Sequence, residues 1–227
     1  MKKLPKILIF DVNETLLDLS KLKTQVNKAL GSDTAFDLWF STLLHYSLVE
    51  NATGIYKDFG AVGKNTLRMV SKNLHNLLDD ASIDTILSNI TNLSPHPEVK
   101  ASLQILKDSG FILIALTNGG QKTVEAQLEY AELTAFFDKI ISVEQLKKFK
   151  PYPNTYQYVL DLYSCTPEEA LLIAAHGWDI YGAQMAGLQT GFIARPGKNI
   201  YDISTAPEYV EEDLAALTKR LTSQKES

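Results

Sequence analysis

The sequence has a single cysteine, no long apolar stretch, no internal repeat and no low-complexity segment. Its one thiol, Cys165, cannot form a disulfide within the chain, so a reducing cytoplasm is the expected compartment. No apolar stretch approaches the ~20 residues that span a bilayer. The apolar stretch near the N-terminus covers only residues 7–10, which is too short for a signal peptide. These absences argue against a membrane protein and against a disulfide-stabilised secreted domain.

A strong excess of one charge sign is also missing. The 227 residues contain 22 Lys and Arg against 27 Asp and Glu, which gives a net charge of −5, and there is no basic run. This mild acidity argues against a surface for nucleic acid or anionic lipid. With 45% hydrophobic residues the composition is that of a globular protein. The length suffices for one large domain, or for one domain plus a smaller module.

Short apolar runs recur along the chain and are the candidate strands. They are apolar at successive positions, which suits strands buried on both faces of a parallel sheet, and they cover residues 4–10, 111–116, 139–143, 170–175 and 190–194. Helical patterns lie between them, over residues 98–108, 122–131 and 154–163. This alternation predicts an α/β fold with a doubly wound parallel sheet.

The segment between the first two strands has a different pattern. It contains no convincing strand, and its helical patterns cover residues 21–30, 35–48, 61–74 and 83–90. We therefore expect a core domain made of residues 1–17 and 98–227, with a helical cap domain inserted at residues 18–97.

Polar residues follow the predicted strands, at the edge of an open α/β sheet where ligands bind. Each is a weak signal alone, because an Asp after a strand is often a helix cap and a Lys before proline is usually solvated. Their order along the chain is more specific. It runs through Asp11, Val12, Asn13, Glu14, Thr15, Thr117, Asn118, Lys150, His176, Trp178 and Asp179.

This order and spacing resemble the haloacid dehalogenase (HAD) superfamily, over essentially the whole chain and with a cap at the expected insertion point. The four motifs of that superfamily supply a nucleophilic Asp, a Thr or Ser, a Lys and an acidic residue, which here are Asp11, Thr117, Lys150 and Asp179. Its phosphatases carry a second Asp two residues after the nucleophile, where this chain has Asn13, and paired acidic residues in the fourth motif.

Further features resemble the type II (L-2-haloacid) dehalogenase branch. They are Leu38-Trp39, the stretch from Tyr56 to Phe59, Tyr156 six residues after Lys150, and Trp178-Asp179. The resemblance implies hydrolysis of short-chain L-2-haloacids to D-2-hydroxy acids without metal or other cofactor. It also implies a homodimer.

The resemblance assigns roles around Asp11, which would attack C2 of the substrate and form an ester intermediate. Lys150 would keep Asp11 ionised, Thr15 would orient it, and Asp179 and Tyr156 would steady Lys150. The substrate carboxylate would be bound by Thr117 and by N–H groups near Val12, Asn13 and Asn118. Asn118 with Trp39 and Phe59 would line the halide side, and Phe40 and Trp178 complete the expected substrate site.

Three positions depart from the family pattern. Phe40 stands where these dehalogenases usually have an Arg that cradles the halide, Ala174-Ala175-His176 replaces Ser-x-Asn, and Glu14 replaces a Gly. Histidine titrates near physiological pH, and a carboxylate on the neighbouring loop could orient it. We therefore expect Glu14 and a neutral His176 to activate water by general base catalysis. A neighbouring Glu would raise the pKa of His176 above ~6.5, so turnover would begin to fall near neutrality.

Two other functions remain open at this stage. One is a magnesium-dependent HAD phosphatase acting on a small phosphorylated metabolite, against which Asn13 argues. The other is a degenerate member that only binds a small carboxylate, against which the retained Asp11, Thr117, Lys150 and Asp179 argue. Glu14 as a solvated loop charge and His176 as a packed loop histidine are the alternatives to the catalytic pair.

Overall fold

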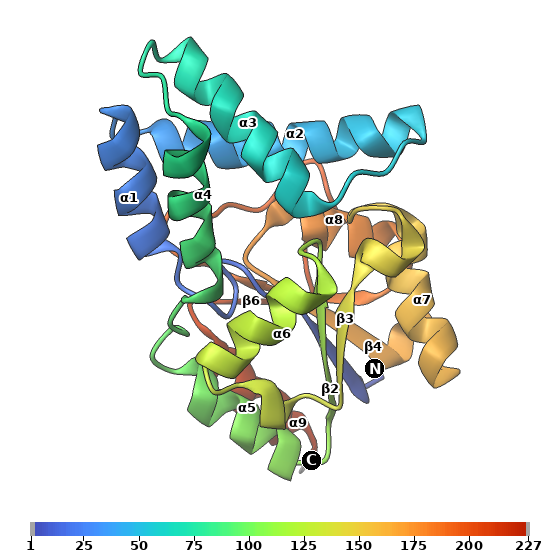
Figure 1. Cartoon of the computed structure of the whole chain (residues 1–227). Coiled ribbons are helices and arrows are strands. Elements are labelled where there is room, and N and C mark those ends of the chain that lie inside the picture. Colours follow the sequence, from blue (N-terminus) through green and yellow to red (C-terminus); the bar gives the residue numbers. More distant parts are fainter. Residues whose placement is uncertain (1–2, 226–227) are drawn as a thin grey trace.

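The centre of the molecule is a parallel sheet. The structure, a computed structural model, describes residues 3–225 (Figure 1). The sheet has six strands in the order β3-β2-β1-β4-β5-β6, all paired in parallel. The bounds are Ile7–Phe10 (β1), Ile112–Thr117 (β2), Lys139–Ser142 (β3), Ala170–Ala174 (β4), Gln189–Ile193 (β5) and Tyr209–Glu211 (β6). The doubly wound α/β fold expected from the sequence is confirmed.

Helices cover both faces of the sheet, and alternate side chains of β1 are buried on the two faces. Leu8 and Phe10 pack with one group of helices, which comprises α5 (Val99–Asp108), α6 (Gln121–Tyr130) and α9 (Leu214–Lys225). Ile7 and Ile9 pack with the other group, which comprises α7 (Pro153–Tyr163) and α8 (Gly177–Met185). Strand β6 and helices α8 and α9 are additions to the elements expected from the sequence.

Four further helices lie beyond the carboxyl edge of the sheet, at the top of Figure 1. They are α1 (Ser20–Leu30), α2 (Ala35–Thr53), α3 (Phe59–Asn73) and α4 (Asp80–Ser88). Helix α3 begins at Phe59 because the Asp58 side chain accepts a hydrogen bond from the Ala61 N–H. Among residues 3–225, none of the helices has the length and apolar content needed to cross a bilayer.

The connections into and out of this helical segment run side by side. The N–H of Asp18 donates to the carbonyl of Ser94 at 2.8 Å, and Leu17 forms an antiparallel bridge with Pro95. The chain therefore enters and leaves the helical segment at one place, next to the end of β1. The expected core segments 1–17 and 98–227 include residues 1–2 and 226–227, which lie outside the described part.

Candidate active site

The expected site residues meet at the carboxyl ends of β1, β2 and β4. Strand β1 is paired with β2 on one side and β4 on the other, so the loops that follow them are neighbours. This is where the winding direction of the sheet changes, which opens a crevice for ligands. Asp11 directly follows β1, is 5% exposed, and is held by its N–H, which donates to the Ile173 carbonyl at 3.0 Å.

Both carboxylate oxygens of Asp11 have partners. Oδ1 lies 2.9 Å from Lys150 Nζ. Oδ2 accepts a hydrogen bond from the Thr15 hydroxyl at 2.7 Å and lies 3.1 Å from His176 Nδ1. The Thr15 hydroxyl in turn accepts from the Ala175 N–H at 2.9 Å. The carboxylate is thus fixed in orientation, as the expected role of Thr15 requires.

Lys150 is buried, with 2% of it exposed, and its ammonium group has hydrogen-bond acceptors for all three protons. Its Nζ donates to Asp11, to the Leu116 carbonyl at 3.0 Å and to Asp179 Oδ2 at 2.6 Å. The Tyr156 hydroxyl donates to the other Asp179 oxygen. Because all three ammonium protons are used, the expected anchoring of Lys150 by Asp179 and Tyr156 is present.

The ionisation of this cluster follows from its charges. Burial alone would raise the pKa of Asp11, but the Lys150 charge and the hydrogen bond from His176 outweigh it and hold that pKa well below its usual range. Burial lowers the pKa of Lys150, and the charges of Asp11 and Asp179 more than compensate and raise it. Asp11 is therefore an anion at neutral pH, as a nucleophile must be.

His176 lies between two aromatic rings and two carboxylates. Its ring stacks on Phe40 and on Trp178, with centroid distances of 6.1 and 5.3 Å. Its Nδ1 faces Asp11, and its Nε2 lies 2.9 Å from Glu14 Oε2. The predicted contact between Glu14 and His176 is present, and the ring is also in direct contact with the nucleophile.

The pKa of His176 is shifted in the expected direction. Burial disfavours the charged ring, but hydrogen bonds and charges from Asp11 and Glu14 outweigh it and raise the pKa of His176 to about 9. At neutral pH the ring of the free protein is therefore a cation. The pKa is raised by two carboxylates, because Asp11 contacts the ring as well as the expected Glu14. A neutral His176 acting as the base in the ester state, with turnover falling from near neutrality, stays a prediction.

The backbone at Glu14 explains why glycine is usual there. Glu14 has φ of 62°, in the left-handed region that glycine adopts readily and that costs other residues roughly 1–2 kcal/mol. Its N–H donates to the Leu17 carbonyl, and its own carbonyl lies 3.3 Å from His96 Nε2. A glutamate held in this strained conformation, with its carboxylate on His176, points to a role for its side chain.

The expected substrate residues surround Asp11. Val12 is fully buried, and the side-chain oxygen of Asn13, Oδ1, accepts a hydrogen bond from the Gln127 side-chain amide at 3.0 Å. The Thr117 hydroxyl accepts from the Gly119 N–H at 3.1 Å, and no acceptor for its own proton is found within residues 3–225. The Asn118 amide pairs with the Lys150 backbone through both of its ends, which leaves one amide proton for a ligand.

An apolar cavity of about 160 Å³ lies between the helical segment and the sheet edge. Trp39, Phe40 and Phe59 line it together with Asn13. The indole N–H of Trp39 donates to the Gly63 carbonyl at 2.9 Å, so the contribution of Trp39 to the cavity is its ring. The other lining residues are mostly aliphatic or glycine: Leu19, Leu43, Gly60, Gly63, Leu87, Ile90, Gly119, Gly120, Thr123 and Gln127.

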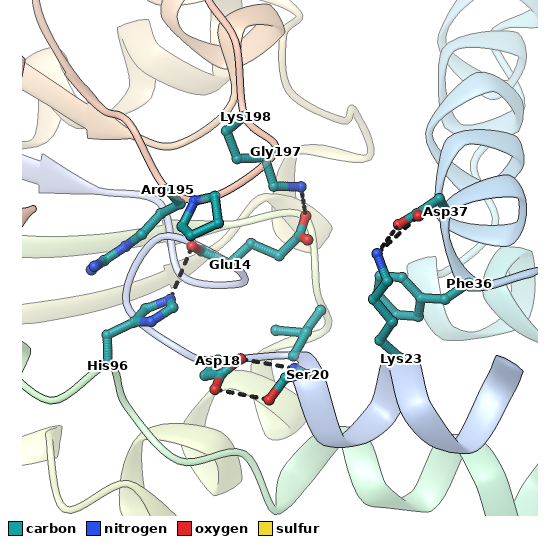
Figure 2. Close-up of a pocket in the computed structure, with 12 residues that line it drawn as sticks. Glu14, Asp18, Ser20, Lys23, Phe36, Asp37, His96, Arg195, Gly197 and Lys198 are labelled. Carbon is teal, nitrogen blue, oxygen red and sulfur yellow. Dashed lines mark hydrogen bonds and ion pairs between the residues drawn. The ribbon is translucent and has the colours of Figure 1, made fainter. Parts of the chain in front are cut away.

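Two basic residues at the site were not among those expected from the sequence. Lys198 Nζ lies 2.6 Å from Glu14 Oε2, and Arg195 donates to the Thr15 carbonyl at 2.9 Å and to Glu98 at 2.6 Å. Both line a polar cavity of about 520 Å³ that also includes Glu14 (Figure 2). They follow the expected strand 190–194, so reading the residues after that strand end would have found them.

The donor set around Asp11 does not fit a magnesium site. Mg²⁺ prefers an octahedral shell of carboxylate oxygens and water. Here two cationic groups, Lys150 and His176, occupy the Asp11 oxygens. Within residues 3–225, no group of three or more His, Cys, Asp or Glu side chains is arranged to hold a metal ion.

Comparison with known proteins agrees with this site. The family model of the haloacid dehalogenase-like hydrolases matches residues 8–193, and the chain belongs to that family. (S)-2-haloacid dehalogenase 4A of Burkholderia cepacia is 30% identical over 192 residues, which cover 83% of each chain. (S)-2-haloacid dehalogenase 1 of Pseudomonas sp. (strain CBS-3) is 29% identical over 221 residues, covering 94% of this chain and 96% of the relative.

A solved structure is similar along its whole length. A crystal structure of a dehalogenase with an intermediate complex has a TM-score of 0.90 and 26% identity, covering 98% of this chain and 99% of the other. The resemblance to the L-2-haloacid dehalogenase branch, inferred from the motifs, is confirmed.

Proposed function

We propose that the protein is a hydrolytic dehalogenase that converts short-chain L-2-haloacids to D-2-hydroxy acids through an ester on Asp11. The observation that carries this proposal is the buried Asp11 carboxylate, ionised between Lys150 and His176. Curated relatives at 29–30% identity are named (S)-2-haloacid dehalogenases, which supports the same substrate class. No metal or other cofactor takes part in the proposed reaction.

In the first step an Asp11 oxygen attacks C2 of the substrate. The C–O bond forms as the C–halogen bond breaks, and the halide leaves with the electron pair. Thr117 and backbone N–H groups near Val12, Asn13 and Asn118 bind the substrate carboxylate. Trp39, Phe59 and Trp178 surround the alkyl and halogen side.

The cation on the halide side comes from His176 in place of the arginine of the family. Phe40 occupies the usual arginine position and stacks on the His176 ring at 6.1 Å. With its pKa at about 9, that ring carries a positive charge at neutral pH. The Arg-to-Phe and Asn-to-His changes are therefore spatially linked, since the aromatic ring supports the imidazolium that supplies the charge.

In the second step water hydrolyses the ester. Esterification removes the negative charge of Asp11, one of the two charges that keep His176 protonated, so the ring can lose its Nδ1 proton. Neutral His176 then takes a proton from the water that attacks the Asp11 carbonyl, while Glu14 orients the ring through Nε2. Cleavage of the ester releases the hydroxy acid and restores the Asp11 carboxylate. One halide and one proton leave in each turnover.

We also propose that residues 18–97 form a cap domain over a core of residues 1–17 and 98–227. The molecule would act as a cytoplasmic homodimer that binds neither nucleic acid nor membranes. The single cysteine, the net charge of −5 and the family resemblance support this. Light scattering coupled to gel filtration tests the dimer, and a mass close to 25.3 kDa would contradict it.

Halide release tests the proposed reaction against the phosphatase alternative. Purified protein should release chloride from L-2-chloropropionate equally well in EDTA and in magnesium, and should leave p-nitrophenyl phosphate intact. Magnesium-dependent phosphate release without halide release would overturn the proposal. Binding of the acid without turnover would favour the degenerate carboxylate-binding protein.

Stereochemistry is a second test of the same mechanism. Backside attack by Asp11 inverts C2, and hydrolysis at the Asp11 carbonyl leaves C2 untouched. From racemic 2-chloropropionate we expect D-lactate, with D-2-chloropropionate left over, on chiral chromatography. L-lactate from the L-substrate, or equal consumption of both enantiomers, would contradict this arrangement.

A further inference from the structure

A row of six alternating charges runs through the site. Consecutive members lie 2.6, 2.9, 3.1, 2.9 and 2.6 Å apart, in the order Asp179, Lys150, Asp11, His176, Glu14 and Lys198. With His176 protonated the row holds three positive and three negative charges and is neutral. Esterification of Asp11 removes one negative charge and leaves the row with a net positive charge.

Lys198 is the outer end of this row. It follows Gly197, whose left-handed φ of 77° turns the chain back toward Glu14. The Lys198 side chain is 24% exposed, and its Nζ contacts Glu14 Oε2 (Figure 2). The same Glu14 oxygen lies 2.9 Å from the Nε2 of His176. Its charge therefore acts on the carboxylate that holds the His176 proton.

The other charged groups around Glu14 are engaged elsewhere. In the same cavity Lys23 pairs with Asp37 at 2.8 Å, and Arg195 pairs with Glu98. Asp18 accepts hydrogen bonds from Ser20. Burial and the Arg195 charge lower the pKa of His96, which keeps that ring neutral. Among residues 3–225, Lys198 is therefore the cation that still balances Glu14 once His176 is neutral.

We propose that Lys198 is a positioning residue that lets His176 lose its proton once Asp11 is esterified. The positive charge of Lys198 offsets the negative charge of Glu14. In the ester state Glu14 therefore stabilises the protonated His176 ring less strongly. Without Lys198, the Glu14 charge would keep the His176 ring protonated, and ester hydrolysis would be slow because no neutral imidazole would be present to act as the base. This inference rests on the proposed function, because it concerns the second half of that reaction.

The charge coupling can be measured without substrate. Asp11→Asn places a neutral group where the ester would be, and nitrogen NMR of His176 then reports its pKa. We expect the pKa of His176 to be lower in Asp11→Asn than in the wild type, and to rise again by about one pH unit in Asp11→Asn/Lys198→Met. An unchanged pKa between the two Asn variants would overturn the inference, whatever reaction the protein catalyses.

Kinetics test the consequence for turnover. In Lys198→Met, rapid-quench experiments should show a normal halide burst but roughly tenfold slower ester hydrolysis at pH 7, restored at higher pH. Lys198→Arg should keep the wild-type pH profile, and Lys23→Met, in the same cavity, is the matched control. A wild-type profile in Lys198→Met would refute the role of Lys198, whereas absence of halide release from the wild type would refute the proposed function.

Discussion

At the residue scale, the chemistry depends on how neighbours set the charge of one imidazole ring. His176 contacts Asp11 through Nδ1 and Glu14 through Nε2, and its pKa of about 9 makes it a cation in the free protein. The same ring can act as a base only after Asp11 has become a neutral ester. In the proposed mechanism, one side chain thus supplies a positive charge in the first half-reaction and a proton acceptor in the second.

Glu14→Gln tests the orienting carboxylate. The amide keeps the size of the side chain but removes the charge that stabilises the imidazolium, so the pKa of His176 should fall. We expect ester hydrolysis to slow roughly tenfold, less than the ~10²–10⁴-fold contributed by a general base, and its pH profile to move to lower pH.

The matched control for this variant is Asp18→Asn, in the same cavity but bonded to Ser20. It should leave the rate and the profile unchanged. A pH profile of Glu14→Gln that coincides with the wild type would show that Glu14 does not act on His176.

At the element scale, strand order decides which loops meet. Asp11 and His176 were expected at adjacent strand ends because their residues follow apolar runs, and β1 and β4 do pair. Lys198 follows β5, and the same rule would have found it had that strand end been read. Helix α8 has nine residues and two glycines, and β6 has three residues, so neither carries enough periodicity to be recognised from sequence.

Helix α8 also needs a small residue at one point of contact. A Cβ on Gly182 would lie 2.3 Å from Pro151 Cβ and 2.6 Å from the Tyr156 hydroxyl. Gly182→Ala should therefore lower the free energy of unfolding by about 1–3 kcal/mol, measured by urea denaturation. It should also slow halide release, since Tyr156 is displaced from Asp179.

Gly63→Ala, inside α3, is the comparison. Its Cβ would meet Leu43 and Trp39 at 3.7–3.8 Å, which is ordinary van der Waals contact. The higher helix propensity of alanine should then raise the free energy of unfolding by up to about 1 kcal/mol. If the two variants changed stability equally, the close approach of α8 to Pro151 would not be the cause.

At the scale of the whole molecule, the fold was predictable, and so was the direction of the His176 pKa shift, but the contact between His176 and Asp11 was not. The strand–helix alternation and the motif order were sufficient for the sheet and for the placement of Asp11, Lys150 and Asp179. The second carboxylate on His176 is that of Asp11, and this contact depends on the side-chain conformation of His176 between the loops after β1 and β4. No periodicity in the sequence reports such a conformation.

The charged His176 should make global stability depend on pH. The pKa of His176 is about 9 in the folded protein and ~6.5 in the unfolded chain. Its protonation therefore contributes fully to the free energy of unfolding below pH ~6.5, and this contribution is lost as the pH rises to about 9. Urea denaturation at pH 6 and pH 9.5 should show a loss of about 3 kcal/mol in the wild type. His176→Gln should show little of this loss, and parallel losses in both proteins would contradict the raised pKa.

Trapping the ester on Asp11 is the sharpest test of whether Asp11 forms that ester and His176 helps to hydrolyse it. In His176→Ala mixed with L-2-chloropropionate, ester formation should slow because the cation on the halide side is lost, but ester hydrolysis should slow more. Mass spectrometry of the peptide that contains Asp11 should therefore show an accumulating addition of the 1-carboxyethyl group. The amount should match a burst of chloride about equal to the enzyme sites. Wild-type turnover in His176→Ala, or an inactive variant whose Asp11 peptide is unmodified, would contradict the account.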